Sequence, residues 1–246
     1  MAAKRAEPAR YVDLHIEIDV CDMFLVKEAE RLFRFYQGPR GTFVDIGAHV
    51  GLVSLFAATE LGFQRIVAIE TWWRNFEMLK VNIERNGLES IITPVLGAVV
   101  KEDNGPRAIY KAGTNEGQYS LHFNPRLLPE VGTVDSIPFC GVIEEVGLVD
   151  FLKVDIEGGE YEILAPSDEV RHALHHVHWL DLEMHGPNRD YFDDEQMHGL
   201  GYRQDDYQAE LRAFLVDCGF SDEPPASRAG DAGVLSSSNH GFGATP

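Results

Sequence analysis

The chain has 246 residues, with 21 lysines and arginines against 40 aspartates and glutamates, so its formal charge is −19 with histidine neutral. Phosphate backbones and anionic membranes attract clustered Lys and Arg, so this acidic balance argues against nucleic acid or a membrane as the main partner. Hydrophobic residues make up 44% of the chain and charged residues 25%, which excludes a chain that is disordered throughout.

No apolar run reaches the roughly 18 to 20 residues that cross a bilayer. Residues 1–8 lack the apolar core of a secretion signal. We therefore expect a cytoplasmic protein.

The first part of the chain predicts alternating strands and helices. Residues 11–34 change from an alternating apolar pattern to a helical one, which predicts a strand or hairpin and then a helix. The strands expected next are 42–46, 66–69 and 91–96, and the helices between them are 52–60 and 75–85. Strict alternation of this kind predicts right-handed βαβ units and a parallel sheet.

The alternation is interrupted at residues 101–148, which are rich in Gly, Asn, Pro and Glu. This segment is typical of an insertion that could cover a site, with strand-like pieces at 108–110 and 119–123. The parallel pattern then resumes with these expected elements: strand 151–156, helix 160–164, a helical stretch near 169–176, strand 177–183 and helix 207–218.

The domain organisation follows from these elements. We expect one α/β domain over residues 39–246, preceded by an extension over 1–38 that packs on its core. Within the domain, 101–148 is the insertion-like segment, and 221–246 is a flexible or weakly structured tail with one weak strand candidate at 233–236.

The segment from Phe43 to Gly51 runs from an apolar strand through a glycine turn into a helix, which is where an open parallel sheet places a ligand. Asp45 lies near the end of this strand, and Glu70 ends the next one. A carboxylate at the tip of the second strand is placed to accept both hydroxyls of a ribose. The pattern therefore predicts a ligand that contains adenosine.

The glycine spacing favours S-adenosylmethionine over a dinucleotide. The pattern from Asp45 to Gly51 is D-x-G-x-x-x-G, whereas a dinucleotide site carries G-x-G-x-x-G. Asp45 would hold the ammonium group of the ligand, directly or through water, and the amides of Gly47 to Gly51 would hold its carboxylate. A plain strand–turn–helix corner is the alternative, and Glu70 at the matching position argues against it.

A second group of charges follows in the strand that begins at Phe151. Lys153, Asp155 and Glu157 alternate, so in an extended segment all three project from one side. Charges in a buried strand are costly unless they are paired or used. An internal ion pair between Lys153 and Glu157 is the structural alternative to a role in catalysis.

The sequence resembles the FkbM family of S-adenosylmethionine-dependent methyltransferases over about residues 40 to 185. The matching pieces are Val44–Gly51, Glu70 with Asn82–Asn86, Gly97–Val99, Val134–Asp135 and, most specifically, Leu152–Glu160. The resemblance implies a Rossmann-like class I methyltransferase fold, a mostly parallel twisted sheet with helices on both faces. It also implies O-methylation of a small molecule, a sugar or natural product, with S-adenosylhomocysteine as the second product.

The resemblance also implies which residues surround the cofactor. Ala98 is expected near the adenine, and the full set of expected contacts is Asp45, Gly47, Ala48, His49, Gly51, Glu70, Thr71, Trp72, Gly97 and Ala98. The family usually has a proline after the acid, whereas this chain has Thr71 and two tryptophans. Trp72 and Trp73 could stack on adenine or cap the acceptor pocket, and packing of at least one in the core is the alternative.

Methyl transfer to an alcohol needs an in-line geometry and a group that takes the hydroxyl proton. The carboxyl ends of the strands at 151–156 and 177–183 carry the candidates, and two acidic rims should meet across one crevice. The residues that we assign to catalysis are Asp155, Glu183, His185, Glu157 and Lys153. Asp155 and Glu183 would be the carboxylates of the acceptor site, and His185 a base with an ordinary pKa of about 6.5. A loop histidine is the alternative for His185.

Several alternatives stay open at this point. We assign no metal ligands, although an oxygen-rich site with one histidine also suits Mg²⁺ or Mn²⁺. The reaction could instead be N-methylation of an amine, amide, guanidine or macromolecule, but the tetrapeptide N/D-P-P-Y is absent. The chain could also bind an adenosine ligand without catalysis. The expected partner is a small hydroxylated acceptor, and a homodimer is the default assembly.

Overall fold

The computed structural model describes residues 10–11, 14–15, 32–33, 36–111, 119–122, 130–185, 193–203 and 206–221. Most of the expected N-terminal extension and almost all of the expected tail lie outside these residues. None of the helices in the described part of the chain is long and apolar enough to span a membrane.

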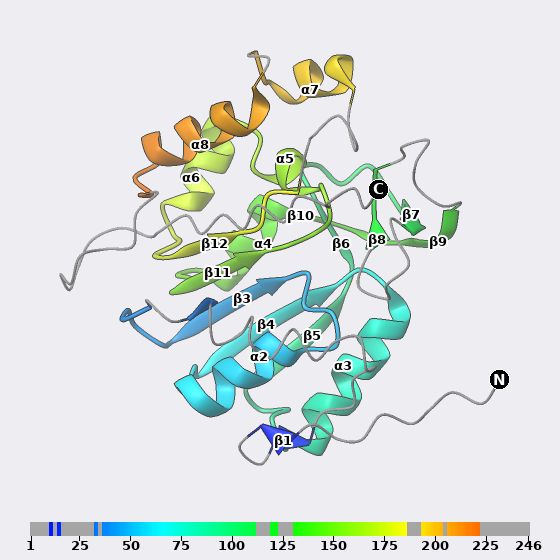
Figure 1. The fold of residues 1–246 in the computed structure, drawn as a ribbon, viewed down its shortest axis with the longest axis vertical. Coiled ribbons are helices and arrows are strands. Elements are labelled where there is room, and N and C mark those ends of the chain that lie inside the picture. Colours follow the sequence, from blue (N-terminus) through cyan, green and yellow to red (C-terminus); the bar gives the residue numbers. More distant parts are fainter. Residues whose placement is uncertain are drawn as a thin grey trace, which may run out of the picture.

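A sheet of five parallel strands forms the centre of the molecule, in the order β12-β11-β3-β4-β5 (Figure 1). Its strands are β3 (Thr42–Ile46), β4 (Arg65–Glu70), β5 (Ile92–Leu96), β11 (Phe151–Val154) and β12 (Leu180–Leu182). The chain builds outward from β3 to β5 and then returns to place β11 on the other side of β3. The strand order therefore reverses between β3 and β11, and ligands of such sheets bind beyond the carboxyl ends of the strands at this point. The expected Rossmann-like topology is confirmed.

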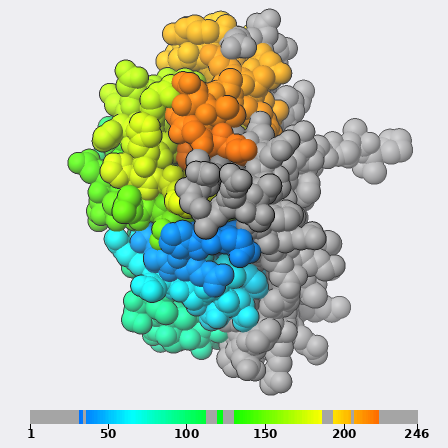
Figure 2. Space-filling view, turned by 90° about the vertical axis from the view of Figure 1, so that its left-hand side faces the viewer, coloured from blue at the N-terminus to red at the C-terminus, as the bar shows by residue number. Residues whose placement is uncertain are grey.

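Helices cover both faces of this sheet because the side chains of β3 alternate. Phe43 packs with α2 (Leu52–Phe56), its continuation η2 (Ala57–Leu61) and α3 (Trp73–Arg85). Val44 and Ile46 pack into the opposite layer. The helices of that layer are α4 (Phe139–Val146), α5 (Glu160–Ile163), α6 (Asp168–Leu174), α7 (Asp194–Leu200) and α8 (Tyr207–Asp217). Figure 2 shows the two layers as adjacent parts of the surface, one blue to cyan and one green to orange.

Several elements differ from the expected ones. The strand expected at 151–156 ends at Val154, and the one expected at 177–183 is reduced to β12, preceded by an isolated bridge between Val149 and Val177. Helix α7 was not expected, and α4 lies inside the segment that we interpreted as an insertion. Phe139, Val142 and Ile143 of α4 are buried at helical spacing, so α4 is the crossover helix before β11.

The rest of the insertion-like segment forms a small separate sheet. Its antiparallel strands have the order β8-β7-β9, and they are β7 (Arg107–Lys111), β8 (Tyr119–Ser120) and β9 (Glu130–Val134). A short parallel pair, β6 (Ala98–Val100) with β10 (Ser136–Pro138), joins it to the main body. Figure 1 shows this small sheet on the side toward which the parallel strands point. We call β7, β8 and β9 the rim sheet.

His122, directly after β8, is buried beside Glu162 of α5, with 3.4 Å between Nε2 and the carboxylate. Burial lowers the pKa of His122 to about 4, although Glu162 acts to raise it. The imidazole is therefore neutral in the folded protein at neutral pH. In the unfolded chain the pKa returns to about 6.5.

This difference predicts a pH dependence of stability. Between about pH 6.5 and pH 4 only the unfolded chain protonates at this position, so His122 lowers the free energy of unfolding as the pH falls through that window. Above about pH 6.5, His122 contributes no pH dependence to the free energy of unfolding. Urea unfolding at pH 7 and pH 4.5 should show a loss about 2 kcal/mol smaller in His122→Asn than in the unchanged protein. Equal losses in the two proteins would contradict the burial of a neutral imidazole.

Candidate active site

The turn after β3 can be built only with glycine at two positions. Gly47 has a φ of +86°, and a Cβ there would lie 1.8 Å from the carbonyl oxygen of Asp155. Gly51 has a φ of +89°, and its Cβ would lie 2.4 Å from Leu79 of α3. Both positions therefore exclude a side chain because of neighbouring parts of the protein itself.

The N–H groups of this turn already have partners within the chain. Those of Gly47 and Ala48 both donate to the carbonyl oxygen of Ile69 at 3.0 Å, and that of Gly51 donates to Ala48 at 2.8 Å. His49, with a left-handed φ of +52°, donates its N–H to Glu70. The turn keeps its shape through these bonds, so its expected binding of the cofactor's carboxylate stays a prediction.

Glu70 ends β4 and lies beside this turn, as expected. Its carboxylate accepts hydrogen bonds from the N–H of His49 at 2.9 Å and from the N–H of Trp72 at 2.8 Å, while the Asn75 amide lies 3.5 Å away. Burial raises the pKa of Glu70, and these donors oppose the rise. Each oxygen of a carboxylate has two lone pairs, so acceptor capacity remains for the hydroxyls of a ribose.

Lys153 of β11 contacts both the glycine turn after β3 and Asp155, which follows β11. Its Nζ donates to the carbonyl oxygen of Gly47 at 3.2 Å and to Asp155 at 3.0 Å, and it lies 3.7 Å from Asp45. The parallel register places Lys153 directly opposite Asp45 of β3. The structural alternative was an ion pair between Lys153 and Glu157. The ion pairs of Lys153 are instead with Asp45 and Asp155, because β11 ends at Val154 and Glu157 adopts a φ of +53°.

Asp45 is fully buried beneath the turn, where it also accepts a hydrogen bond from the Ser54 hydroxyl of α2 at 2.7 Å. Burial raises the pKa of Asp45, and the charge of Lys153 and the Ser54 hydroxyl oppose this rise. Asp45 is thus part of a buried network with Lys153 and Ser54 within the protein itself. Its contact with the ammonium group of a cofactor stays a prediction.

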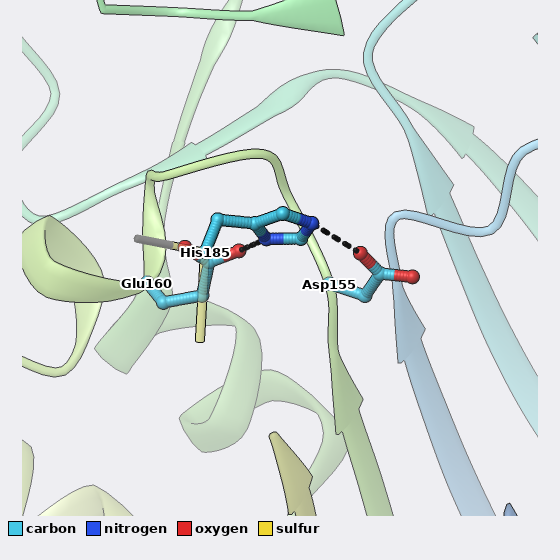
Figure 3. A group of neighbouring side chains, drawn as sticks. All are labelled: Asp155, Glu160 and His185. Atoms are coloured by element: carbon cyan, nitrogen blue, oxygen red, sulfur yellow. Dashed lines mark hydrogen bonds and ion pairs between the residues drawn. The ribbon is translucent and has the colours of Figure 1, made fainter. Parts of the chain in front are cut away.

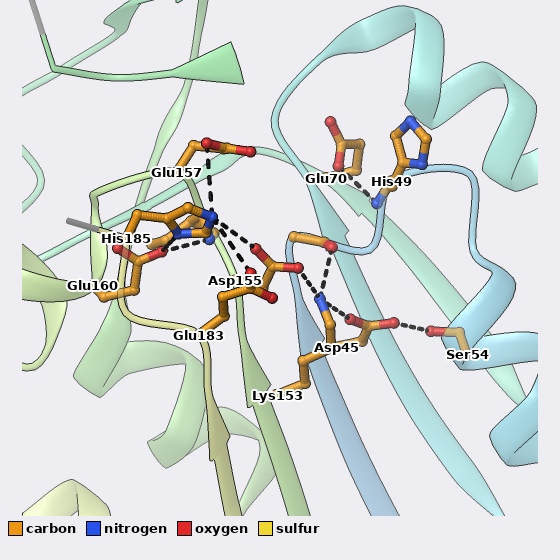
Figure 4. A network of polar contacts seen from close by, with 12 residues as sticks. Asp45, His49, Ser54, Glu70, Lys153, Asp155, Glu157, Glu160, Glu183 and His185 are labelled. Carbon is orange, nitrogen blue, oxygen red and sulfur yellow. Dashed lines mark hydrogen bonds and ion pairs between the residues drawn. The ribbon is translucent and has the colours of Figure 1, made fainter. Parts of the chain in front are cut away.

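His185, three residues beyond β12, lies at the centre of an acidic cluster (Figure 4). Its Nε2 is 3.7 Å from Glu157, 3.8 Å from Asp155 and 3.9 Å from Glu183. Its Nδ1 is 2.9 Å from Glu160. The residues that follow the neighbouring strands β11 and β12 therefore converge around His185. We call these four carboxylates and His185 the acidic cluster.

Glu160 is the member of the acidic cluster that the sequence did not suggest as functional. It is fully buried at the start of α5, and it also accepts hydrogen bonds from the N–H groups of Ile156 and Gly158, each at 2.9 Å. Glu160 thereby fixes both the turn after β11 and the orientation of the imidazole (Figure 3). The only signal for it was its place in the K-x-D-x-E-G-x-E run.

The cluster changes the protonation of its own members. Burial acts to lower the pKa of His185, but the carboxylates raise it well above its ordinary value. Burial raises the pKa of Glu157 to about 7, helped by the neighbouring carboxylates and opposed by His185. Burial also acts to raise the pKa of Asp155, but Lys153 and His185 hold it below its ordinary value. The four carboxylates therefore favour the protonated form of His185, which argues against the expected role of its imidazole as the base.

Asp155, Glu160 and His185 could also hold a divalent cation, because each offers a ligand atom within 4.8 Å of the others. Carboxylates with one imidazole suit Mg²⁺ or Mn²⁺. The hydrogen bond between Glu160 and His185 already accounts for the short distance between them. We therefore assign no metal ion to this group of residues.

The remaining predicted contacts surround the start of α3. Thr71 donates its hydroxyl to the carbonyl oxygen of Gly97 at 3.2 Å, and Ala98 is fully buried. Trp72 is 7% exposed and packs with Ala98 in the core, whereas Trp73 is 52% exposed. The core interpretation is thus confirmed for Trp72.

A cavity of about 220 Å³ opens beside this corner. Its lining residues are Thr71, Trp73, Leu96, Pro106, Ile109, Thr133, Val134 and Asp135. Asp135 brings a carboxylate to this cavity, a position that the sequence alone did not assign. The cavity adjoins the residue after Glu70 and so lies on the cofactor side of the site.

A parallel sheet with acids at the ends of β3 and β4, and a second acidic group across the strand-order reversal, defines a class I methyltransferase domain. The family model described as "Methyltransferase FkbM domain" matches residues 45–221, which is most of the chain. The chain belongs to this family, and the resemblance seen in its motifs is confirmed.

Solved structures show more distant likenesses. A methyltransferase FkbM from Methylobacillus flagellatus KT is 23% identical with a TM-score of 0.35, over 55% of this chain and 30% of that one. An O-methyltransferase from Bacillus cereus in complex with SAH is 14% identical with a TM-score of 0.32, over 56% of this chain and 46% of that one. A precorrin-6y C5,15-methyltransferase from Geobacter metallireducens GS-15 is 16% identical with a TM-score of 0.38, over 86% of this chain and 75% of that one.

The chain thus spans less than half the length of the first two of these proteins. The family assignment rests on the family model and not on these distant likenesses. No match was found among curated proteins.

Lys153 offers the most direct test of the site's electrostatics. Lys153→Met should lower the free energy of unfolding by about 3 to 5 kcal/mol, because it leaves Asp45 and Asp155 without their buried cation. Urea unfolding at pH 7 measures the change. Lys80→Met is the matched control, because Lys80 is exposed and its contacts with Glu77 and the Phe76 ring lie on the surface of α3. It should change stability by less than about 0.5 kcal/mol. An equally small change in Lys153→Met would contradict the pairing.

Proposed function

We propose that the protein transfers the methyl group of S-adenosylmethionine to a hydroxyl group of a small molecule, a sugar or natural product, and releases S-adenosylhomocysteine. The observation that carries this proposal is the position of Lys153. Its Nζ binds both the Gly47 carbonyl of the cofactor turn and Asp155 of the acidic cluster. The two halves of the site are therefore neighbours, as a transfer reaction requires.

The cofactor has a consistent position in this site. The ribose hydroxyls would bind Glu70, and the adenine would enter the cavity beside Thr71, where Asp135 can accept a hydrogen bond from its amino group. The sulfonium would then lie toward the acidic cluster. Carboxylates outnumber cations there, so the cluster favours a positively charged sulfonium over a neutral thioether.

The chemistry at the acceptor follows from the same groups. The acceptor oxygen attacks the methyl carbon as the bond from carbon to sulfur breaks, and the electron pair of that bond stays on sulfur. The hydroxyl proton passes to a carboxylate of the acidic cluster, for which we propose Asp155 or Glu183. The surrounding carboxylates favour the protonated form of His185, so we propose that it serves as a fixed cation that orients them.

The excess of carboxylates around His185 also favours a second candidate, N-methylation of an amine or guanidine. A cationic acceptor would be attracted to the same cluster. The two candidates differ in the atom that carries the methyl group, so mass spectra of the product from isotope-labelled acceptors distinguish them.

Cofactor binding is the first part of the test. Calorimetric titration of S-adenosylhomocysteine into protein freed of bound ligand should give micromolar affinity. Glu70→Ala should weaken it at least about 10-fold, because hydrogen bonds to a charged acceptor contribute about 1.5 to 3 kcal/mol. Glu77→Ala, an exposed glutamate on α3, is the matched control and should bind like the unchanged protein. Absence of binding in folded, unchanged protein would rule out the proposed function.

Turnover is the second part. Labelled methyl from S-adenosylmethionine should appear on a member of a panel of hydroxylated sugars and natural products. Asp155→Asn should lower kcat by about 100-fold or more while S-adenosylhomocysteine still binds. Asp217→Asn, whose aspartate pairs with Arg171 at the surface, should leave kcat unchanged. Binding without turnover on any member of the panel, amines included, would instead favour a protein that binds the cofactor without catalysis.

A further inference from the structure

Glu162 of α5 is a buried carboxylate that the proposed chemistry does not use. Arg107 at the start of β7 binds it with both arms of its guanidinium, at 3.0 Å and 3.2 Å. Such two-bond pairs fix orientation as well as distance. The N–H of Lys101 lies 3.3 Å from the same carboxylate, and the imidazole of His122 lies 3.4 Å from it. Glu162 therefore contacts β7 and the chain on either side of it.

The strand pairing places Arg107 within a wall of the cavity that we assign to adenine. Arg107 lies opposite Val134 of β9, and both Val134 and Ile109 line this cavity. Ile109 is two residues from Arg107 in β7, so their side chains project from the same face of the rim sheet. Pro106 and Thr133 also line the cavity. The rim sheet and the residue before it thus supply four of the eight residues that line the proposed adenine cavity.

The same wall contacts the corner that we assign to the ribose. Trp72 packs in one cluster with Ile109 and Val134. Its ring also stacks on Tyr119 of β8, with 4.7 Å between centroids and 20° between planes. The backbone N–H of Trp72 donates to Glu70, the acid that we assign to the ribose. A displacement of the rim sheet would therefore change the space between this corner and the opposite wall of the cavity.

Glu160 lies on the same short helix as Glu162 but acts on a different part of the molecule. It binds His185, and it accepts hydrogen bonds from the N–H groups of Ile156 and Gly158. None of these three partners belongs to the rim sheet. Removal of the charge of Glu162 should therefore leave the contacts of the acidic cluster in place.

From these contacts we infer that Glu162 is a positioning residue for the cofactor's adenine, because through Arg107 it holds the rim sheet where that sheet forms the cavity wall. The inference rests on the proposed function, which assigns the adenine to this cavity. Neither Glu162 nor Arg107 lines the cavity, so the pair acts through the strands that do. Loss of the pair should weaken the binding of ligands that carry adenine and spare the acceptor.

The test uses Glu162→Gln, which keeps the shape of the side chain and removes the charge that Arg107 binds. Glu145→Gln makes the same change at an exposed position of α4 and is the matched control. In calorimetric titration, the affinity for S-adenosylhomocysteine should fall about 10-fold or more in Glu162→Gln and stay within about twofold in the control. Unchanged affinity in folded Glu162→Gln would overturn the inference.

A ligand without adenine separates positioning from a general loosening of the site. S-ribosylhomocysteine keeps the ribose and the amino-acid part, and its affinity is measured by displacement of labelled S-adenosylhomocysteine. Glu162→Gln should change this affinity by no more than about twofold. Equal losses for the two ligands would overturn the inference.

Hydrogen exchange tests the cavity wall without the weaker ligand. In the unchanged protein, S-adenosylhomocysteine should slow exchange in β7 and β9, because the bound adenine packs against them. At the same ligand saturation, this protection should be smaller in Glu162→Gln. Exchange in β7 and β9 that does not respond to the ligand would overturn the inference.

Kinetics with the acceptor that turns over in the panel give a further readout that a merely structural role would not produce. The KM for S-adenosylmethionine should rise about 10-fold in Glu162→Gln, while kcat and the KM for the acceptor stay within about twofold. A loss confined to kcat or to the acceptor would overturn the inference. If Glu162→Gln does not fold, Arg107→Lys keeps the charge but loses the two-bond geometry, and the same pattern should appear in weaker form. Failure of the unchanged protein to bind S-adenosylhomocysteine would overturn the proposed function instead.

Discussion

The ammonium group of Lys153 is the interaction on which the site depends. Lys153 is only 4% exposed, and it lies between Asp45 of β3 and Asp155, the residue that follows β11. Burying those carboxylates without a cation would cost several kcal/mol. The register of β3 and β11 brings Asp45 and Lys153 opposite each other at the point where the strand order reverses. The neutralisation of buried charge and the location of the site thus have the same origin.

The acidic cluster adds a second network of charges, in the residues that follow β11 and β12. Glu160 holds the imidazole of His185 through Nδ1, and three further carboxylates surround Nε2. These carboxylates favour the protonated form of His185, and Lys153 together with His185 lowers the pKa of Asp155. These fixed contacts hold the carboxylates and cations of the site in place, so the groups are already oriented when a ligand arrives.

The sequence predicted the parallel core and the cofactor corner because both depend on local patterns. Apolar strands that end in Asp45 and Glu70 place these acids at one edge of any parallel sheet, whatever the packing. The expected alternation of Lys153, Asp155 and Glu157 failed at its last member, because the chain leaves the strand after Val154 and Glu157 adopts a left-handed conformation. The pKa of His185 could not be predicted, since it depends on four carboxylates that converge only in the folded protein.

The rim sheet was the least predictable part, because its strands are short and its contacts join residues far apart in the chain. Nothing local in the sequence indicates that Arg107 meets Glu162 or that Trp72 meets Tyr119. Helix α4 was also missed, although Phe139, Val142 and Ile143 have helical spacing, because it is short and lies in a segment rich in Gly, Asn, Pro and Glu. The positions of the rim sheet and of α4 therefore depend on packing between residues that are distant in the sequence, and no local motif indicates that packing.

A crystal structure of the protein with S-adenosylhomocysteine tests the central claim most directly. The account predicts the ribose hydroxyls on Glu70, the sulfur directed toward the acidic cluster, and Lys153 still bound to Gly47 and Asp155. Ligand bound elsewhere, or a site in which Lys153 has left both partners, would contradict it.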